Sequence, residues 1–207
     1  MRQFPVHLVG FHGGQNDQNN FKENLKIINN QIKQIENLVN EFSDFARMPK
    51  PIFKKNNLIQ ILNENIKLLA EIDKDIKIQL SNNNKEIYFN SDKEQISRVF
   101  FNLIKNAIES IQQKNEKNPN FDKKILIEIS DNNDHIKLNI TDNGIGFKNL
   151  KNDINEILNP YFTTKKNGTG LGLSIVNKIV NDHKGELEFI SIQDGAKIEI
   201  IFNKNGN

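Results

Sequence analysis

Apolar residues recur along the chain with two different periods. In the first quarter of the chain they are spaced alternately four and three residues apart, at Phe21, Leu25, Ile28, Ile32, Ile35, Val39 and Phe42. This a/d spacing predicts a helix that packs in a coiled coil or bundle. An alternative is one amphipathic helix lying on its own domain. Pro49 and Pro51 predict that the helix ends near Met48, because proline lacks an amide donor and restricts the residue before it.

Further along, helical and alternating patterns succeed one another. Helical spacing covers residues 58–70, 92–113 and 171–183. Alternation, which is typical of strands, covers residues 76–80, 86–90, 124–130, 135–141, 186–191 and 196–202. Antiparallel strand pairs separated by helices predict an α+β fold, a two-layer sandwich with one face of the sheet buried under three helices.

Composition narrows the possible classes of protein. The chain has 207 residues and a net charge of +2, so it has room for one domain with an appendage, and its charge gives no support for direct nucleic-acid binding. It contains no cysteine, which excludes disulfides and thiolate metal sites. Its apolar stretches are all too short to predict a membrane span. The glycine- and asparagine-rich start predicts a disordered leader over residues 1–20.

Two asparagines lie one turn apart on the predicted helix 92–113, although asparagine is a poor helix former. A carboxamide oxygen suits Mg²⁺, which takes few protein ligands and keeps several waters. Asn106 is therefore a candidate metal ligand. Asn102 is a candidate for orienting a metal-bound water or contacting phosphate, with Lys105 beside it. The alternative is a pair of polar residues that cap a core helix.

Three other segments fit the same ligand. Asp142 ends a strand, where a carboxylate can accept a hydrogen bond from an exocyclic amine such as that of adenine. The glycines after Asp142 leave space for a flat ring. The alternative interpretation of this segment is a hairpin-type turn. In NPYFTTKK, hydroxyls and an ammonium suit polyphosphate, and Phe162 can anchor the loop; the alternative is an exposed basic loop. In GTGLGLSIV, glycines precede a helix whose N-terminus can bind phosphate, although a tightly packed turn has the same composition.

The order of these motifs resembles that of the sensor histidine kinases. NLIKNA, DNGIGF, YFTTK and GTGLGLSIV look like their N, G1, F and G2 boxes, which belong to the ATP-binding superfamily shared with Hsp90, type II topoisomerases and the MutL repair proteins. LVNEFSDFARMPKP resembles the end of the second bundle helix in kinases of the nitrogen-regulation (NtrY/NtrB-like) type. The resemblance covers roughly residues 57–203.

This resemblance implies a Bergerat ATP-binding fold, a mixed sheet covered by helices, preceded by a long amphipathic bundle helix. The implied organisation is a leader over residues 1–20, the second helix of a dimerisation and phosphotransfer bundle over 21–50, and the catalytic domain over 51–207. The first bundle helix is expected to be absent.

The resemblance also implies roles for single residues. Asn106 matches the Mg²⁺ ligand and Asp142 the adenine-reading aspartate. The other residues expected to line the ATP site are Asn102, Lys105, Gly144, Gly146, Phe162, Thr163, Thr164, Lys165, Gly168, Thr169, Gly170, Leu171 and Gly172.

Three positions differ informatively within the superfamily. Asn102 stands where hydrolysing relatives have a glutamate that activates water. Because an amide is not a general base, slow hydrolysis of ATP is expected. Asn102 and Asn106 are the candidate catalytic residues. Glu109 stands where many sensor kinases have lysine. Lys184 replaces a usual glycine, which leaves Gly185 as the expected left-handed helix cap.

The implied activity is transfer of the ATP γ-phosphoryl group to a histidine and then to a response regulator. None of the four histidines, His7, His12, His135 and His183, stands in the family's H-E-x-x-N-P context, so no self-phosphorylation is expected. Implied partners are a phosphoacceptor bundle in cis or trans, a response-regulator receiver domain, and a second copy that pairs through residues 21–48. The portion is expected in the cytoplasm, with the intact kinase anchored in the inner membrane.

Two alternative functions remain at this stage. One is a protein serine kinase of the anti-sigma-factor type, which shares the boxes but usually lacks a bundle helix. The other is a non-catalytic ATP-binding adaptor, or half of a split kinase. Phosphoryl transfer to a separately supplied bundle domain discriminates between them.

Overall fold

The computed structural model describes residues 14–147, 154–165 and 168–204. The chain divides after Asp44 into two compact units. Helix α1 (Gly14–Ala46) makes up the described part of the first unit and ends two residues into the second. The leader predicted over residues 1–20 thus differs from the structure at residues 14–20, which are helical. Extending an existing helix over polar residues costs little free energy. Residues 1–13 lie outside the described residues.

All seven residues of the a/d pattern on α1 are exposed, namely Phe21, Leu25, Ile28, Ile32, Ile35, Val39 and Phe42, and so are Ile27 and Leu38 beside them. Such a stripe on a long helix is typical of a surface that another helix covers. Among the described residues, no helix combines the length and apolar character that crossing a membrane requires.

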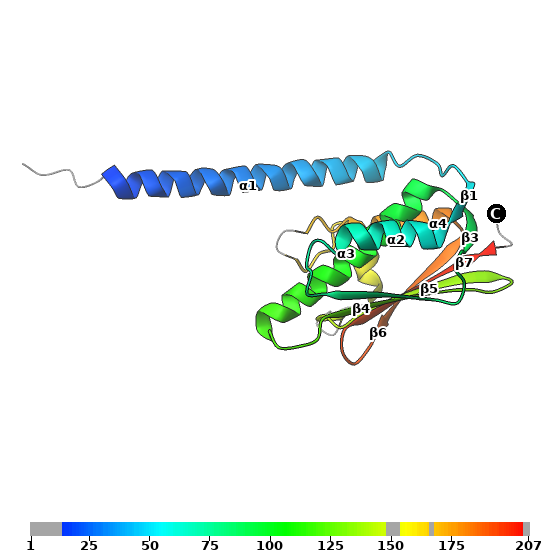
Figure 1. The fold of residues 1–207 in the computed structure, drawn as a ribbon. Coiled ribbons are helices and arrows are strands. Elements are labelled where there is room, and N and C mark those ends of the chain that lie inside the picture. Colours follow the sequence, from blue (N-terminus) through cyan, green and yellow to red (C-terminus); the bar gives the residue numbers. More distant parts are fainter. Residues whose placement is uncertain (1–13, 148–153, 166–167, 205–207) are drawn as a thin grey trace, which may run out of the picture. The chain divides into compact units, whose positions relative to one another are not determined.

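The second unit is an α/β sandwich (Figure 1). Its helices are α2 (Leu58–Leu69), α3 (Lys93–Lys117), the 3-10 helix η1 (Ile154–Leu158) and α4 (Gly172–Asp182). Its strands are β1 (Lys54–Asn57), β2 (Lys77–Asn82), β3 (Tyr88–Ser91), β4 (Lys124–Asp131), β5 (His135–Asp142), β6 (Gly185–Ser191) and β7 (Ala196–Asn203).

The main sheet is mixed and has five strands in the order β2-β4-β5-β7-β6. Strand β2 runs parallel to β4, and the other neighbours are antiparallel. The prediction that β2 and β3 form an antiparallel pair is wrong: β3 pairs with β1 in a separate two-stranded sheet. Alternation identifies a half-buried strand but does not select its neighbour, and the polar sequence KKNN of β1 gives no alternation at all.

One face of the main sheet lies under α2, α3 and α4 (Figure 1). In the central strand β5, every second residue is buried: Ile136, Leu138, Ile140 and Asp142. Since side chains alternate between the faces of a strand, Asp142 belongs to the face that the helices cover. The fold thus buries a carboxylate at the end of a central strand.

A buried histidine connects the end of α4 to the start of α3. His183, at the end of α4, is fully buried; its Nε2 accepts a hydrogen bond from Asp92 N at 3.0 Å, and its Nδ1 donates to the Ile179 carbonyl at 2.8 Å. Asp92 in turn caps α3 by accepting from Gln95 N, and its Oδ2 accepts from Ile52 N at 2.8 Å. One imidazole therefore joins α4 to the start of α3.

The backbone turn after α4 differs from the expected one. Lys184 adopts the left-handed conformation, with φ 54°, and Gly185 does not. Gly185 is needed for a different reason: a Cβ atom there would lie 2.9 Å from the Ile201 carbonyl oxygen and 2.9 Å from the Phe202 ring. The glycine allows β6 to approach β7 closely, while a lysine takes the strained position.

His183→Ala is expected to lower the free energy of unfolding by about 2–4 kcal/mol, because it leaves a cavity and removes the imidazole acceptor of Asp92 N. Burial lowers the pKa of His183 below its ordinary value of 6.5, so the unfolded chain binds the proton more readily and this contribution is lost as the pH falls below about 6.5. Urea unfolding at pH 5.5 and 7.5 measures both effects. The control is His135→Ala, on a partly exposed histidine; an equal loss in both variants would contradict the role of His183.

Candidate nucleotide-binding site

Helix α3 carries one polar residue of the site on each of three successive turns. Asn102, Asn106 and Ser110 are spaced four residues apart, so they follow one side of the helix over about 12 Å. Each of the three faces a different segment of the chain: Asn102 the start of α4, Asn106 the loop after η1, and Ser110 the end of β5. The helix thereby brings together three motifs that are far apart in sequence.

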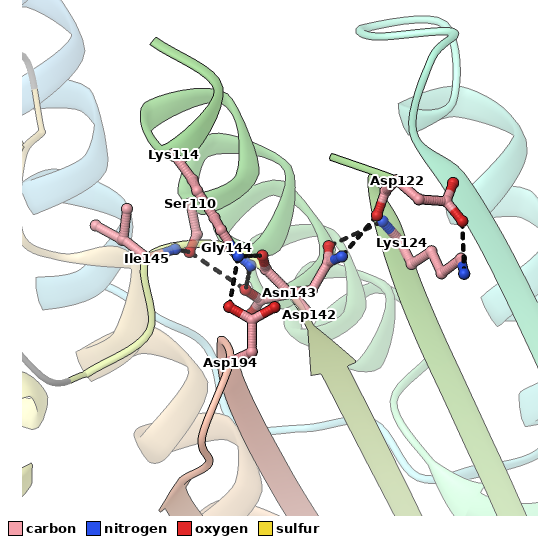
Figure 2. A network of polar contacts seen from close by, with 9 residues as sticks. All are labelled: Ser110, Lys114, Asp122, Lys124, Asp142, Asn143, Gly144, Ile145 and Asp194. Atoms are coloured by element: carbon pink, nitrogen blue, oxygen red, sulfur yellow. Dashed lines mark hydrogen bonds and ion pairs between the residues drawn. The ribbon is translucent and has the colours of Figure 1, made fainter. Parts of the chain in front are cut away.

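The Asp142 carboxylate is held at the Ser110 end of this row (Figure 2). Its Oδ1 accepts hydrogen bonds from Gly144 N at 2.8 Å and from the Ser110 hydroxyl at 3.2 Å. Ile145 N also donates to Ser110 Oγ, at 3.1 Å. One oxygen of the carboxylate is fixed by these bonds, so its orientation is set before any ligand binds.

Burial raises the pKa of Asp142 to about 6. Desolvation penalises the carboxylate, and it outweighs the opposing effects of the Gly144 N–H, the Ser110 hydroxyl and the Lys114 charge. A carboxylate that is kept ionised at neutral pH despite this cost is typical of a functional site, where a partner for the charge arrives with the ligand.

The loop after Asp142 packs too tightly for side chains. A Cβ atom on Gly144 would lie 2.6 Å from the Ser110 carbonyl carbon, and one on Gly195 would lie 2.7 Å from the Asp142 carbonyl carbon. Gly146 and Gly195 also have positive φ angles, of 65° and 106°. These glycines let the loop lie between α3 and the turn that joins β6 to β7.

Polar side chains fasten the same loop on both sides (Figure 2). Lys114 Nζ donates to the Asn143 carbonyl at 2.8 Å and pairs with Asp194 Oδ1 at 2.5 Å. The Asn143 amide accepts from Lys124 N at 2.9 Å and donates to the Asp122 carbonyl at 2.6 Å. The sequence DNG is thus the anchored end of a central strand and not a hairpin turn.

The loop after η1 meets the middle of the row on α3. Lys165 Nζ donates to Asn106 Oδ1 at 2.8 Å and forms an ion pair with Glu109. Phe162 packs against the core, as its position in the motif predicted. Thr163 accepts a hydrogen bond from Lys165 N at 3.1 Å, and Thr164 is exposed.

The two arms of this loop are joined by backbone contacts. Tyr161 N donates to the Gly170 carbonyl at 3.0 Å, and both residues have φ angles near 70°. A Cβ atom on Gly170 would lie 2.7 Å from Tyr161 Cα. The left-handed conformation at a tyrosine is strained backbone, which occurs preferentially at ligand sites.

The N-terminus of α4 faces Asn102 without a side-chain cap. Leu171, the N-cap residue, is buried and makes no side-chain hydrogen bond to the helix. A Cβ atom on Gly172 would lie 3.5 Å from Asn102 Oδ1, and the buried Asn102 Nδ2 makes no hydrogen bond within the described part of the chain. Backbone N–H groups at a helix start that has no side-chain cap, beside an unpaired amide donor, suit a phosphate group.

The structure thus brings most of the sequence-predicted residues together in two groups joined by α3. Asp142, Gly144 and Gly146 form the group beside Ser110. The other group lies beside Asn102 and Asn106, and consists of Phe162, Thr163, Lys165, Gly168, Thr169, Gly170, Leu171 and Gly172. Lys105 borders the second group through Glu109: its Nζ lies 3.9 Å from Glu109, which pairs with Lys165, and 6.0 Å from the Phe101 ring centre.

Sequence reasoning missed the residues that hold the Asp142 loop. Ser110 had a detectable signal, because it lies one turn beyond Asn106 on the same side of the helix. Lys114 continues the same spacing by one more turn. Asp194 and Gly195 had no such signal, since only the pairing of β5 with β7 brings the Asp194–Gly195 turn to Asp142.

Comparison with known proteins places this geometry in a family. Residues 91–205 match the family described as "Histidine kinase-, DNA gyrase B-, and HSP90-like ATPase". An NtrY-like sensor histidine kinase of Rickettsia bellii is 34% identical over 184 residues, which are 88% of this chain and 29% of that protein. The chain therefore spans less than a third of the length of that relative.

Two solved structures share the fold. The nucleotide-free catalytic domain of the histidine kinase ThkA aligns with a TM-score of 0.64 and 27% identity, covering 74% of this chain and 96% of that one. A structure of ThkA with the response regulator TrrA aligns with a TM-score of 0.69 and 21% identity, covering 96% of this chain and 53% of that one. The family match covers more than half of the chain and includes α3, the Asp142 loop and α4, so the chain belongs to the histidine kinase-, DNA gyrase B- and HSP90-like ATPase family.

Proposed function

We propose that this chain is the ATP-binding catalytic portion of a sensor histidine kinase of the nitrogen-regulation type. The observation that carries the proposal is the row on α3, which faces a buried carboxylate at one end and an uncapped helix N-terminus at the other. The row extends over about 12 Å, which suits a ligand with an amine at one end and phosphates at the other. The similarity to an NtrY-like sensor kinase supports the subtype.

In this proposal Asp142 reads adenine. Its Oδ1 is occupied by Gly144 N and the Ser110 hydroxyl, so the other carboxylate oxygen is the one offered to the exocyclic amine. A charge-assisted hydrogen bond in a buried site is stronger than one between neutral groups. The missing side chains at Gly144 and Gly146 leave space beside the carboxylate for a planar base.

The residues at the other end fit phosphates and Mg²⁺. Asn106 Oδ1 accepts a hydrogen bond from a cationic donor, the Lys165 ammonium, which supports its assignment as a metal ligand. A single amide oxygen suits Mg²⁺, since this ion takes few protein ligands and completes its shell with phosphate oxygens and water. When bound, Mg²⁺ would neutralise phosphate charge. Asn102 Nδ2 and the α4 N-terminus would bind the phosphates directly.

We infer phosphoryl transfer and not rapid hydrolysis. The reaction is attack of a histidine ring nitrogen on the γ-phosphorus, with cleavage of the bond to the bridging oxygen and departure of ADP. Asn102 stands where hydrolysing relatives have a glutamate, and an amide does not take a proton from water at neutral pH. The site then orients the γ-phosphoryl group for a nucleophile that another helix supplies.

The proposed partners follow from this chemistry and from α1. A phosphoacceptor histidine would come from a bundle domain, and a response-regulator receiver domain would take the phosphoryl group from it; ThkA has been solved with such a regulator. The exposed apolar stripe of α1 would pair with bundle helices, including those of a second copy. Since ATP is the donor, we expect this portion to act in the cytoplasm.

The test is binding of ADP with and without Mg²⁺, measured by calorimetry. Asn106→Ala is expected to weaken Mg²⁺-dependent binding by about ten- to a hundredfold, because a metal ligand is lost, while metal-free binding changes little. Asn63→Ala, on an exposed asparagine of α2, is the matched control and should bind like the unsubstituted chain. No saturable ADP binding, with or without metal, would contradict the proposed function.

A further inference from the structure

One cation already lies in the candidate metal position, and it belongs to the chain itself. The Lys165 ammonium contacts two oxygens of α3, Asn106 Oδ1 at 2.8 Å and Glu109 Oε2 in a close ion pair. Asn106 and Glu109 are three residues apart, so both oxygens lie on the same side of the helix, about one turn apart. Two oxygens from one helix face thus hold a single positive charge.

The backbone around Lys165 keeps the ammonium in reach of α3. Lys165 N donates to Thr163 Oγ1 at 3.1 Å, and the Lys165 carbonyl accepts from Gly168 N at 3.3 Å. Phe162 packs against the core three residues earlier. The side chains of Lys165 and Glu109 are 29% and 32% exposed, so water screens this pair less than a surface pair.

The same carboxamide oxygen cannot serve an ammonium and Mg²⁺ together, because the two positive charges would repel at close range. We propose that Glu109 is a positioning residue that holds the Lys165 ammonium on Asn106 in the nucleotide-free protein, so that Mg²⁺ enters with nucleotide only by displacing it. This inference rests on the proposed function. Lys105, whose Nζ lies 3.9 Å from Glu109 Oε1, provides a second partner for the carboxylate after Lys165 leaves.

The proposal and the simpler roles of Glu109 predict opposite effects of its removal on Mg²⁺ binding. If Glu109 were a metal ligand, or only a negative charge near the metal, its removal would weaken Mg²⁺ binding. If Glu109 holds the competing ammonium, its removal loosens Lys165 and strengthens Mg²⁺ binding. The direction of the change therefore separates the two explanations.

The experiment compares Glu109→Gln, Lys165→Met and the double variant. The first measurement is the Mg²⁺ concentration that half-saturates binding of a fluorescent ADP at fixed concentration. Glu109→Gln is expected to lower it about two- to tenfold, the range of a partly buried ion pair. In the Lys165→Met background the same substitution should raise it, because only the attraction of Glu109 for the metal remains. Glu116→Gln, which removes an exposed charge from the same helix, should change neither value.

The second measurement needs neither metal nor nucleotide. Backbone hydrogen exchange of residues 161–165 is expected to be faster in Glu109→Gln than in the unsubstituted chain, because the ion pair no longer restrains the loop. An increased or unchanged Mg²⁺ requirement in Glu109→Gln, or unchanged exchange, would overturn the inference while nucleotide still binds. Absence of saturable nucleotide binding by the unsubstituted chain would instead overturn the proposed function, and with it the proposed displacement of Lys165 by Mg²⁺.

Discussion

Replacing Asp142 with asparagine is expected to stabilise the nucleotide-free domain and to weaken its binding of adenine nucleotides. Burial raises the pKa of this carboxyl group from 3.8 to about 6, so between these values the folded chain binds more protons than the unfolded chain. Stability from this group therefore falls as the pH rises from about 4 to 6, and above that range ionised Asp142 costs at most about 3 kcal/mol. A neutral amide avoids this cost.

The same substitution removes the acceptor that adenine requires. The amide oxygen can still accept from Gly144 N, but the amide then presents N–H donors to the amine of the base. Losing one charge-assisted hydrogen bond costs about 1.5–3 kcal/mol, or about ten- to a hundredfold in affinity. ADP affinity of the unsubstituted chain should also fall as the pH decreases through about 6, because the carboxylate becomes protonated.

Urea unfolding and ADP calorimetry at pH 7.5 test the two effects separately. Asp134→Asn, on an exposed carboxylate in the β4–β5 turn, is the matched control and should change neither quantity appreciably. Unaltered ADP affinity in Asp142→Asn would exclude Asp142 as the adenine acceptor. Reduced stability of the nucleotide-free variant would show that hydrogen bonds to the carboxylate outweigh its desolvation. A functional group that destabilises its own fold is the usual compromise between stability and activity.

Local patterns in the sequence were sufficient to predict α2, α3 and α4 and the six strands β2 to β7, to within a few residues. Long-range pairing was not predictable in the same way. The parallel contact between β2 and β4 depends on the connection through β3 and α3, and alternation within β2 contains no information about it. The left-handed conformation at Lys184 was missed because glycine is the residue that normally takes it, and here the glycine is needed for strand packing.

In the candidate site, too, local patterns were predictable from the sequence and long-range contacts were not. Asn102 and Asn106 could be chosen as candidates because two asparagines on one side of a half-buried helix contradict helix propensity, and such conflicts often mark functional sites. The contact between Lys165 and Glu109 could not, since 56 residues separate the pair and both belong to ordinary charged types. Motifs of unusual composition were visible in the sequence, whereas the side chains that support them became visible only in the fold.

Incubation of this chain alone with ATP and Mg²⁺ is expected to give no stable phosphohistidine, whereas a supplied bundle domain with its histidine should become phosphorylated. His183 is fully buried, and both of its ring nitrogens are engaged, with Asp92 N and the Ile179 carbonyl. His135 begins β5 and alternates with the buried residues of that strand, so its side chain lies on the sheet face opposite α3 and the site. Neither His183 nor His135 can therefore reach a γ-phosphorus bound near Asn102.

Labelled ATP with acid and base treatment of the product identifies a phosphohistidine, because its phosphate is labile in acid and stable in base. In the supplied bundle domain, replacing the histidine with alanine should abolish labelling, and Asn106→Ala in the chain should reduce it strongly. His7 and His12 lie outside the described residues, so they are tested directly. Acid-labile phosphate on the chain alone, lost in His7→Ala or His12→Ala, would contradict the prediction and give the N-terminal segment a part in the reaction.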